Sequence, residues 1–514
     1  MINVCEMLER SAGRFPDKTA FSDPKSSVTF GQLLSYAKGI ATCFLTNGYM
    51  NGSERSVLFY MEKCTAALPI MFAAVYCNAF YSFVDIRQSD ERSAGIIDRV
   101  APSVIITDEA NKDRLLKITG GKTDHLMAED LTDSERLASY TIDEEALLAE
   151  RSRFFDRQPL YVNFTSGSTG TPKGVAVSHA SVIDFISVFT ETFGITDSDI
   201  IANQAPFDFD VSVKDIYSGL YTGATVMLIP REYFTAPTTL MDYICEGRAT
   251  VLIWAVTAMC FISIMNGFDY RTPEDLRMVM FSGEVMPVKQ LNKWMDHVPQ
   301  ATYVNLYGPT EITCNCTYHI INRRYGNEES IPIGTAFYNE KVFLLDENDN
   351  VVTKEDIEGE ICVGGTCVAI GYYKDEEKTN EVFVQNPLND RYHERIYRTG
   401  DLGRYDEKGL LHYCSRKDFQ IKHMGQRIEL TDIEISAMAV ENVTRACCMY
   451  DHKKKKIVMF YTGDKDKDAL LLELRDKLPE FMVPQKTIQL DDLPMNKNGK
   501  IDRNALATAH SITG

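Results

Sequence analysis

A loop rich in glycine and hydroxyl groups joins two apolar stretches near residue 168. It reads Thr165-Ser-Gly-Ser-Thr-Gly-Thr-Pro-Lys-Gly174. The glycines let the backbone curl with its N–H groups inward, while the hydroxyl groups add donors and the lysine adds a positive charge, which predicts a cradle for a polyphosphate. The loop does not fit the Walker A pattern GxxxxGK[ST], and the alternative, a flexible linker, rarely joins two strands. The candidate ligands are Thr165, Ser166, Gly167, Ser168, Thr169, Gly170 and Lys173.

Two further segments carry side chains suited to a nucleotide. In residues 303–311 an apolar strand runs into a Gly-Pro turn. Tyr307 could stack on a base, Asn305 could bond to the edge of that base, and Glu311 could hold Mg²⁺ on a phosphate. A plain turn with a surface glutamate is the alternative. The third segment, Tyr-Arg-Thr-Gly-Asp-Leu-Gly, contains Asp401, whose carboxylate could accept hydrogen bonds from both ribose hydroxyl groups.

The composition excludes several classes of protein. The 514 residues include 54 basic and 73 acidic side chains, which gives a formal net charge of −19. A general nucleic-acid binder needs a basic face to neutralise phosphates, so this function is excluded. Glycine and proline are near their average usage, which rules out collagen-like and low-complexity chains. The 13 cysteines are scattered without a CxxC pair, which predicts free thiols in a reducing cytoplasm.

The pattern of apolar residues predicts an α/β protein. Short strands alternate with helical stretches through about residue 410, which is typical of parallel sheets covered by helices. Short β segments with glycine turns, including one at 371–373, predict a β-rich subdomain at about 325–415. A new unit begins after Arg416-Lys417-Asp418, the candidate hinge. The clearest elements are strands at 56–60, 80–84, 103–107 and 251–254, then helices at 432–440 and 469–478 with strands at 446–450 and 456–462.

One apolar segment could be mistaken for a membrane span. Residues 64–84 contain no charged side chain and are long enough to cross a bilayer. Because Pro69 and Asn78 interrupt the segment, we interpret it as a buried helix at 66–76 followed by a strand at 80–84. The N-terminus reads as a charged amphipathic helix rather than a signal peptide. The sequence therefore predicts a cytoplasmic protein without membrane insertion.

The order of the motifs resembles one family closely. Besides the three segments above, the motifs are Gly359-Glu-Ile-Cys-Val-Gly-Gly365, Arg427-Ile-Glu-Leu430 and Asn498-Gly-Lys-Ile-Asp-Arg503. Together they resemble the adenylate-forming superfamily and, within it, the amino-acid adenylation domains of nonribosomal peptide synthetases and the free-standing D-alanine–carrier protein ligases. The resemblance covers nearly the whole chain. It implies a large N-terminal domain (1–417) of two helix-covered sheets plus the β-rich subdomain, and a small mobile α+β domain (418–514).

The resemblance implies a two-step ligase that uses ATP and Mg²⁺. A substrate carboxylate attacks the α-phosphate of ATP, which gives an acyl-adenylate and pyrophosphate. A thiol, usually the phosphopantetheine of a carrier protein, then takes the acyl group and AMP leaves. Because no phosphopantetheine serine motif follows Lys500, we expect the carrier to be a separate protein.

The resemblance also implies roles for individual residues. The loop at 165–173 would grip the β- and γ-phosphates, Glu311 would hold the metal, and Asp418 would be the hinge. Lys500 would bridge the substrate carboxylate and the α-phosphate, where negative charge develops in the transition state; the alternative is an ordinary lysine on a glycine-containing turn. The remaining ATP contacts would be Asn305 and Tyr307 at adenine, Thr310 at the α-phosphate, and Asp401 and Arg416 at ribose, with Gly308 and Tyr413 in the same site.

The substrate is indicated by Asp210, which matches the aspartate that binds the α-ammonium group in amino-acid-activating members; a helix cap is the alternative. Segments 203–217 and 281–285 look most like the D-alanine ligases, which makes D-alanine the leading candidate. Those ligases carry cysteine in place of Ser282 and an apolar residue in place of Lys214. A lysine in the pocket would suit an acidic or polar side chain. The expected pocket residues are Val211, Lys214, Ala255, Met280, Ser282, Leu306, Cys314 and Asn315.

Two other functions stay open from the sequence. One is an acyl- or aryl-CoA synthetase of the same superfamily, against which Asp210 and the form of segment 498–503 argue. The other is a catalytically silent nucleotide-binding or scaffold protein. A decayed enzyme need not keep the charged residues of all the motifs, yet this chain has Lys173, Glu311, Asp401 and Lys500.

Overall fold

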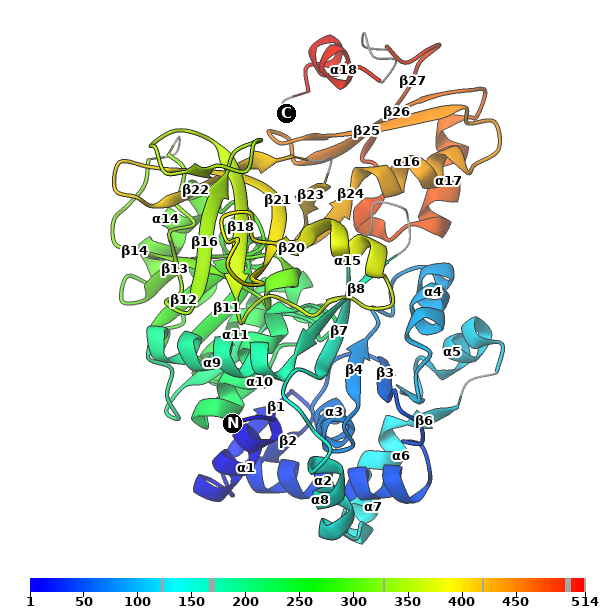
Figure 1. Ribbon diagram of the computed structural model, residues 1–514, viewed down its shortest axis with the longest axis vertical. Helices are drawn as coiled ribbons and strands as arrows, with labels where there is room; N and C mark the ends of the chain where they lie inside the picture. Colours follow the sequence, from blue (N-terminus) through cyan, green and yellow to red (C-terminus); the bar gives the residue numbers. More distant parts are fainter. Residues whose placement is uncertain (122–123, 166–171, 327–328, 418–419, 495–500, 513–514) are drawn as a thin grey trace. The chain divides into compact units, whose positions relative to one another are not determined.

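The computed structural model describes residues 1–121, 124–165, 172–326, 329–417, 420–494 and 501–512 (Figure 1). The chain divides into two compact units. Unit 1 comprises Met1–Val84, Val100–Asn163 and Gly174–Ser415, and unit 2 comprises Asp85–Arg99, Phe164–Lys173 and Arg416–Gly514. The domain limits expected from the sequence, with a hinge at Asp418, stay a prediction, and Asp418 itself lies outside the described residues.

The largest sheet of unit 1 has nine strands in the order β15-β14-β13-β12-β11-β9-β10-β1-β2. Neighbouring strands from β10 through β13 are parallel, and Figure 1 shows β11, β12 and β13 side by side. Every residue of β11 and β12 is buried, as expected for strands covered on both faces. The strands are β1 (Thr19–Ser22), β2 (Ser27–Thr29), β9 (Ile200–Asn203), β10 (Thr225–Leu228), β11 (Val251–Ala255), β12 (Met278–Ser282), β13 (Thr302–Tyr307), β14 (Thr317–Ile321) and β15 (Thr335–Ala336).

Alternate residues of β11 point into two different cores, because side chains alternate along a strand. Ile253 packs in a core that also contains residues of the seven-stranded sheet, whereas Trp254 packs in a second core on the other face. The first core includes α1 (Cys5–Arg14), α2 (Phe30–Thr46), α3 (Ala67–Tyr76), α9 (His179–Phe193) and α10 (Val211–Thr222). The second includes α11 (Pro237–Glu246), α12 (Val256–Ile264), α13 (Gly267–Tyr270) and α14 (Val288–His297).

The seven-stranded sheet, ordered β19-β8-β7-β4-β3-β5-β6, absorbs the apolar segment 64–84. The segment forms α3 and the fully buried strand β4, as the sequence predicts. Among the residues that the structure describes, no helix is long and apolar enough to cross a membrane. The sheet contains β3 (Ser56–Tyr60), β4 (Phe80–Phe83), β5 (Val104–Thr107), β6 (His125–Met127), β7 (Pro159–Thr165), β8 (Lys173–Ser178) and β19 (Gly371–Tyr372), and α5 (Lys112–Thr119), α6 (Ala128–Thr132), α7 (Ser134–Ser139) and α8 (Glu144–Arg151) belong to the same part of the chain.

The six-stranded sheet forms the β-rich part of unit 1, with one difference from the prediction. The segment at 371–373, expected in this part, pairs instead with β8 of the seven-stranded sheet. The Tyr373 N–H donates to the Gly174 carbonyl at 2.7 Å, which fixes this position. The sheet contains β16 (Glu340–Leu345), β17 (Val351–Val352), β18 (Gly359–Gly365), β20 (Phe383–Gln385), β21 (Arg395–Tyr405) and β22 (Leu411–Arg416), and α15 (Glu376–Val382) precedes β20.

Unit 2 contains a small α+β core. The hairpin β23–β24 turns at Met424 and Gly425, both with positive φ, as a two-residue turn of the I′ type requires. Glu434 accepts hydrogen bonds from Arg503 and from the Cys448 N–H, both at 2.6 Å, and so ties the last helix to the three-stranded sheet. The elements are α4 (Asp90–Val100), β23 (Gln420–His423), β24 (Gln426–Glu429), α16 (Leu430–Met438), β25 (Arg445–Asp451), β26 (Lys456–Thr462), α17 (Lys467–Lys477), β27 (Lys486–Gln489) and α18 (Arg503–His510).

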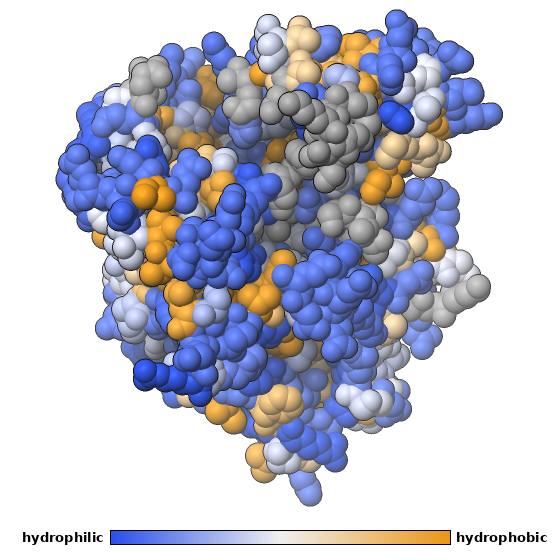
Figure 2. Space-filling view, turned by 45° about the horizontal axis from the view of Figure 1, so that its top comes forward, coloured by the Kyte–Doolittle hydropathy of each residue, from blue (hydrophilic) through white to orange (hydrophobic). Residues whose placement is uncertain are grey.

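The predicted fold class is confirmed: two large helix-covered sheets, a β-rich sheet and a small α+β part are all present. On the face shown in Figure 2, hydrophilic residues cover most of the surface and interrupt the hydrophobic ones. The exposed large hydrophobic residues are spread along the chain, from Ile2 to Leu472.

An ion pair at the start of the parallel strands supports the nine-stranded sheet. Arg277 donates to both carboxylate oxygens of Asp199 at 2.7 Å, and Thr250 donates to the same carboxylate at 2.8 Å. The Asp199 side chain is 3% exposed and that of Arg277 is 38% exposed. We expect Asp199→Asn to lower the free energy of unfolding by about 2 kcal/mol, between the values for surface and buried pairs. Urea unfolding of the variant and the wild type at pH 7 checks this.

The effect of Asp199→Asn should depend on pH. Burial raises the pKa of the Asp199 carboxyl, but hydrogen bonds from Arg277, Thr250 and the Thr196 N–H outweigh burial and the pKa is lowered. A lowered folded-state pKa stabilises the protein above the unfolded-state pKa of about 3.9, and this stabilisation is lost as the pH falls through the folded-state value. The stability difference between wild type and variant should therefore shrink below about pH 4. A difference that stays constant down to pH 3 would contradict this account.

Candidate functional site

The carboxyl ends of four neighbouring strands of the nine-stranded sheet carry the predicted site residues. β9, β11, β12 and β13 lie next to one another and are parallel, so their ends meet at one edge, where α/β sheets commonly bind ligands. Ala255 lies opposite Ser282 across β11 and β12, and both side chains are buried. Met280 and Leu306 are buried within β12 and β13. These pocket candidates therefore come from adjacent strands.

The predicted adenine and ribose residues form a buried pair. The Tyr307 hydroxyl donates to Asp401 Oδ2 at 2.5 Å, and the two side chains are nearly inaccessible to solvent. Burial and the nearby Asp401 charge raise the pKa of Tyr307 well above its usual value, so the phenol keeps its proton. The Tyr413 ring centroid lies 6.4 Å from that of Tyr307. The Asn305 amide nitrogen donates to the Pro332 carbonyl at 2.8 Å, so part of this side chain is used to hold the backbone.

Glu311 is the predicted metal ligand, and its surroundings fit that use. It lies in the short 3₁₀ helix η2 (Thr310–Ile312), beside the buried Thr310, and is itself fully buried. The Tyr372 hydroxyl donates to Glu311 Oε1 at 2.8 Å, which orients the carboxylate. Mg²⁺ binds through one or two carboxylates together with substrate phosphates. The sequence analysis did not identify Tyr372 as a site residue. It lies in β19, within the segment at 371–373 that was expected in the β-rich subdomain.

The predicted ammonium ligand lies at the start of α10. Asp210 is the residue before the first residue of the helix, and its side chain makes no capping hydrogen bond, so the helix-cap interpretation is not supported. The Cys314 thiol donates to the Asp210 carbonyl oxygen at 3.1 Å. Val211 and Lys214 follow on α10, and both are buried. The Lys214 ammonium group donates to Asn315 Oδ1 at 2.5 Å. Two contacts, Lys214 with Asn315 and Cys314 with Asp210, thus bring α10 and the 313–315 loop together beside Asp210.

The loop that carries Cys314 and Asn315 is held in an unusual conformation. Thr313 and Cys314 have φ values of 55° and 77°, a region that side-chain-bearing residues rarely adopt. The Thr313 hydroxyl donates to the Cys367 carbonyl at 2.7 Å, which helps to hold this conformation. Gly308 packs so closely that a Cβ there would lie 2.5 Å from Asn315 Cα. Loops held in such strained conformations often belong to functional sites.

Gly308→Ala is expected to displace this loop. The added Cβ would also lie 2.6 Å from the Cys314 carbonyl oxygen, and backbone atoms cannot move aside cheaply. A displacement near 1 Å costs about 100-fold in catalytic efficiency. Steady-state kinetics of ATP–pyrophosphate exchange, the activity that the sequence motifs imply, should show that loss in kcat/KM. Gly13→Ala, where the new Cβ meets nothing within 4 Å, is the control and should keep wild-type activity; equal losses in both variants would refute the loop's role.

The sequence did not identify the charged residues that support this edge of the sheet. Lys63 donates to Asn203 Oδ1 at 2.8 Å and to the carbonyl oxygens of residues 203–205 at 2.8–3.2 Å. Asn203 in turn donates to Asp215 Oδ2 at 2.6 Å. Burial lowers the pKa of Lys63 to about 7 and raises that of Asp215 to about 7, and the opposite charges counteract both shifts. Lys63 thereby fixes the chain between β9 and α10.

Several predicted residues belong to unit 2 or cannot be described. Thr165 ends β7, Lys173 begins β8, and Arg416 ends β22; the division into units places all three in unit 2. The Lys173 ammonium lies 3.9 Å from Glu429 Oε1 in the same unit. The hydroxyl and glycine loop residues Ser166, Gly167, Ser168, Thr169 and Gly170, together with the hinge Asp418 and Lys500, lie outside the described residues.

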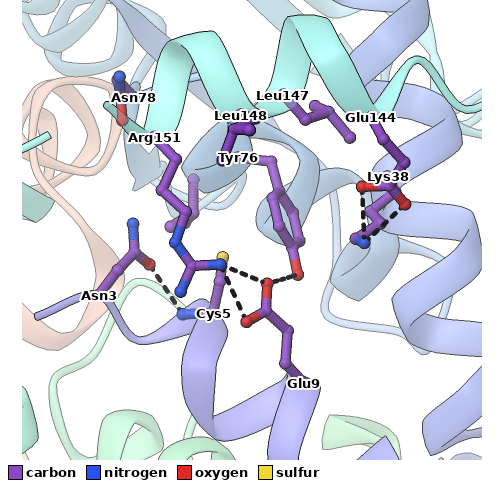
Figure 3. Close-up of a pocket in the computed structure, with 11 residues that line it drawn as sticks. Asn3, Cys5, Glu9, Lys38, Tyr76, Asn78, Glu144, Leu147, Leu148 and Arg151 are labelled. Carbon is purple, nitrogen blue, oxygen red and sulfur yellow. Dashed lines mark hydrogen bonds and ion pairs between the residues drawn. The ribbon is translucent and has the colours of Figure 1, made fainter. Parts of the chain in front are cut away.

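A separate small pocket of unit 1 lies beside α1 and α8 (Figure 3). Arg151 donates to both oxygens of Glu9 at 3.0 Å, and the Tyr76 hydroxyl donates to the same carboxylate at 3.0 Å. Lys38 pairs with Glu144 at 2.8 Å. The pocket measures about 70 Å³, and its charged side chains neutralise one another. None of the predicted site residues lines this pocket, so the candidate site stays at the sheet edge beside Asp210.

Comparison with known proteins identifies the family. The family model described as AMP-binding enzyme matches residues 8–373. The chain belongs to the AMP-binding enzymes. This family is the adenylate-forming superfamily that the motifs resemble, so the sequence-based identification is confirmed.

The relatives include proteins much longer than this chain and proteins of about its length. The chain is 30% identical over 515 residues to bacitracin synthase 1 of Bacillus licheniformis, covering 99% of this chain and 9% of that protein. It is 29% identical over 522 residues to a D-alanine–D-alanyl carrier protein ligase of Bacillus cereus, covering 98% and 99%. The Vibrio cholerae adenylation domain AlmE in complex with glycyl-adenosine-5′-phosphate superimposes with a TM-score of 0.84 at 22% identity, covering 100% of this chain and 98% of that one. The chain thus spans only a small part of the first relative, and the structural likeness shows the fold.

Proposed function

We propose that this AMP-binding enzyme activates an α-amino acid as its aminoacyl-adenylate and then transfers the aminoacyl group to the phosphopantetheine thiol of a separate carrier protein. The observation that carries the proposal is the buried Asp210 carboxylate at the substrate edge of the nine-stranded sheet. Out of water, a carboxylate pairs strongly with a bound cation, and the α-ammonium group of an amino acid would be such a cation. Fatty and aryl acids carry no such cation.

The first step forms one bond and breaks another. A substrate carboxylate oxygen attacks the α-phosphorus of ATP, the bond to the β-phosphate oxygen breaks, and pyrophosphate leaves. In this proposal Asp210 orients the ammonium group so that the carboxylate points toward Thr310, and Lys500 places its positive charge at the carboxylate and α-phosphate. Oriented groups of this kind act mainly by positioning and by stabilising charge in the transition state.

The carboxylate of Glu311 is a ligand of the kind that Mg²⁺ prefers. Mg²⁺, when bound to Glu311, would neutralise phosphate charge during the displacement. Glu311 contributes a hard oxygen ligand whose direction is set by Tyr372. Tyr307 and Asp401 would hold the nucleoside, with the Tyr307 hydroxyl keeping the Asp401 carboxylate in one orientation.

In the second step the carrier thiolate attacks the carbonyl carbon of the adenylate, a thioester forms and AMP leaves. The similarity to the D-alanine–D-alanyl carrier protein ligase extends over 99% of that protein at 29% identity. This similarity supports a carrier protein as partner and keeps D-alanine as a candidate substrate. The 13 free cysteines are consistent with the reducing cytoplasm that we propose as its compartment.

The proposed function is tested by ATP–pyrophosphate exchange with three classes of acid: L- and D-amino acids, fatty acids and aryl acids. We expect exchange with one group of amino acids only. Exchange that requires a fatty or aryl acid, followed by thioester formation on coenzyme A, would establish a CoA synthetase instead. A protein that binds ATP but catalyses no exchange with any of these acids would be the silent nucleotide-binding protein.

A further inference from the structure

Residues 369–373, called the bridging segment below, contact the predicted metal ligand at two points. The Ala369 N–H donates to the Glu311 carbonyl oxygen at 2.9 Å. The Tyr372 hydroxyl donates to Glu311 Oε1 at 2.8 Å. One segment therefore holds both the main chain and the carboxylate of Glu311, so the position and the direction of that carboxylate depend on the same few residues.

The bridging segment is also bound to β8. The Ile370 N–H donates to the Ala176 carbonyl oxygen at 2.8 Å, and the Tyr373 N–H donates to the Gly174 carbonyl oxygen at 2.7 Å. Between these bonds β19 pairs antiparallel with β8. All of these residues belong to unit 1. In the sequence, β8 follows directly on the predicted phosphate loop, so the bridging segment connects the metal ligand to the strand that continues this loop.

Arg395, the first residue of β21, holds the bridging segment in place. Its guanidinium group donates to the Ile370 carbonyl oxygen at 2.7 Å, and the guanidinium carbon lies 4.7 Å from the centroid of the Phe383 ring. A hydrogen bond from a charged donor is stronger than one between neutral groups. Arg395 therefore restrains the segment at the residue that lies between its contacts with Glu311 and its pairing with β8.

The spacing between Glu311 and β8 matters because of what Mg²⁺ requires. Mg²⁺ demands a nearly ideal octahedral arrangement and is bound by one or two carboxylates together with substrate phosphates. In the proposed reaction Glu311 supplies the carboxylate, and the loop before β8 grips the phosphates. Groups that orient a metal ligand through hydrogen bonds strongly affect metal affinity. A segment that contacts both Glu311 and β8 can set their spacing.

We propose that the bridging segment sets the position of the catalytic metal relative to the phosphate loop, and that Tyr372 and Arg395 are its positioning residues. This inference rests on the proposed function. The Tyr372 hydroxyl acts on the Glu311 carboxylate alone, so its loss should weaken metal binding and leave the binding of metal-free ATP unchanged. Arg395 acts on the whole segment, so its loss should weaken the binding of both metal and ATP.

The experiment measures binding to the full chain in the absence of any amino acid. Electron paramagnetic resonance measures the affinity for Mn²⁺ in the presence of ATP, and calorimetry measures the affinity for ATP without metal. Mn²⁺ replaces Mg²⁺ because it accepts the same oxygen ligands. Tyr372→Phe should lower the Mn²⁺ affinity at least about 10-fold without changing the affinity for metal-free ATP. In a Glu311→Gln background the same change should have no further effect, because the carboxylate that it orients is gone.

Two substitutions test Arg395. Arg395→Met keeps an apolar side chain that can pack on the Phe383 ring, but it removes the charged donor, and it should lower the affinity for both Mn²⁺ and metal-free ATP. Arg395→Lys keeps a charged donor and should lose less of both affinities. Thermal unfolding shows whether these variants fold. Tyr372→Phe, which removes a single oxygen atom, decides the inference even where Arg395→Met does not fold.

The matched control is Tyr243→Phe on α11. It removes a hydroxyl that donates to the Leu228 carbonyl oxygen at 3.1 Å, and it should bind Mn²⁺ and ATP like the wild type. The inference is overturned if Tyr372→Phe binds Mn²⁺ as tightly as this control, or if it loses as much affinity in the Glu311→Gln background as in the wild type. Because the binding assay contains no amino acid, a failure of exchange with every amino acid would overturn the proposed function separately.

Discussion

Asp210→Asn is expected to lower amino-acid-dependent pyrophosphate exchange about 1,000-fold, which corresponds to about 4 kcal/mol of transition-state stabilisation. Asparagine has the same shape as aspartate, so the change removes the charge that pairs with the α-ammonium group and little else. The buried position of Asp210 makes this charge effective, because water does not screen it. Most of the loss should appear as a raised KM for the amino acid, and the KM for ATP should change little. Exchange kinetics with varied amino acid and with varied ATP separate the two.

The matched control for this variant is Asp208→Asn. It makes the same carboxylate-to-amide change two residues earlier, at a half-buried position in the same loop, and should retain exchange within a few-fold. A second comparison uses the substrate analogue in which hydrogen replaces the amino group. The wild type should discriminate strongly against this analogue and Asp210→Asn only weakly. If both enzymes discriminate equally, Asp210 does not bind the ammonium group.

Glu311→Gln is expected to lower kcat/KM for exchange at least about 100-fold and to raise the Mg²⁺ concentration needed for half-maximal rate. The glutamine can still accept a hydrogen bond from Tyr372, so the local fold should persist. What it lacks is the negative charge that makes a carboxylate a good ligand for a hard cation. Titration of exchange with Mg²⁺ at fixed free ATP measures both effects.

Glu340→Gln provides the control for Glu311→Gln. Glu340 is also a buried glutamate of unit 1, and burial raises its pKa to about 8, so it is largely protonated at pH 7. Replacement of a neutral acid by an amide removes no charge and should leave the Mg²⁺ dependence unchanged. If Glu311→Gln behaves like this control, Glu311 is not the metal ligand.

The regular elements of this chain could be predicted from sequence because their signals are local. The strand at 56–60 is a continuous apolar run and appears with those bounds as β3. The uncharged segment 64–84 is a helix and a strand, as predicted, because the chain turns at Cys77 and Asn78; Pro69 lies in the first turn of α3, where proline is tolerated. The strand at 371–373 was misassigned, since which sheet it joins depends on β8, some 200 residues earlier, and no local pattern records that pairing.

Site residues could be predicted where they belong to a sequence motif. They could not be predicted where the residue that contacts them comes from a distant segment of the chain. The motifs pointed to Asp210, Tyr307, Glu311 and Asp401. They did not point to Lys63, which contacts residues 203–205 from the loop after β3, or to Tyr372, which contacts Glu311 from β19. Whether Lys214 is buried could not be read from sequence either. Its burial follows from the packing of α10 against the nine-stranded sheet.

The central claim is the formation of an aminoacyl-adenylate, and the most direct measurement is mass spectrometry of the product held by the enzyme. The full chain is incubated with ATP, Mg²⁺, an equimolar mixture of L- and D-amino acids and inorganic pyrophosphatase, and the small molecules are then released and analysed. The account predicts a species with the mass of one amino acid joined to AMP with loss of water, and far less of this species when Asp210→Asn replaces the wild type. Recovery of an adenylate only when fatty or aryl acids are supplied, or of no adenylate at all, would contradict it.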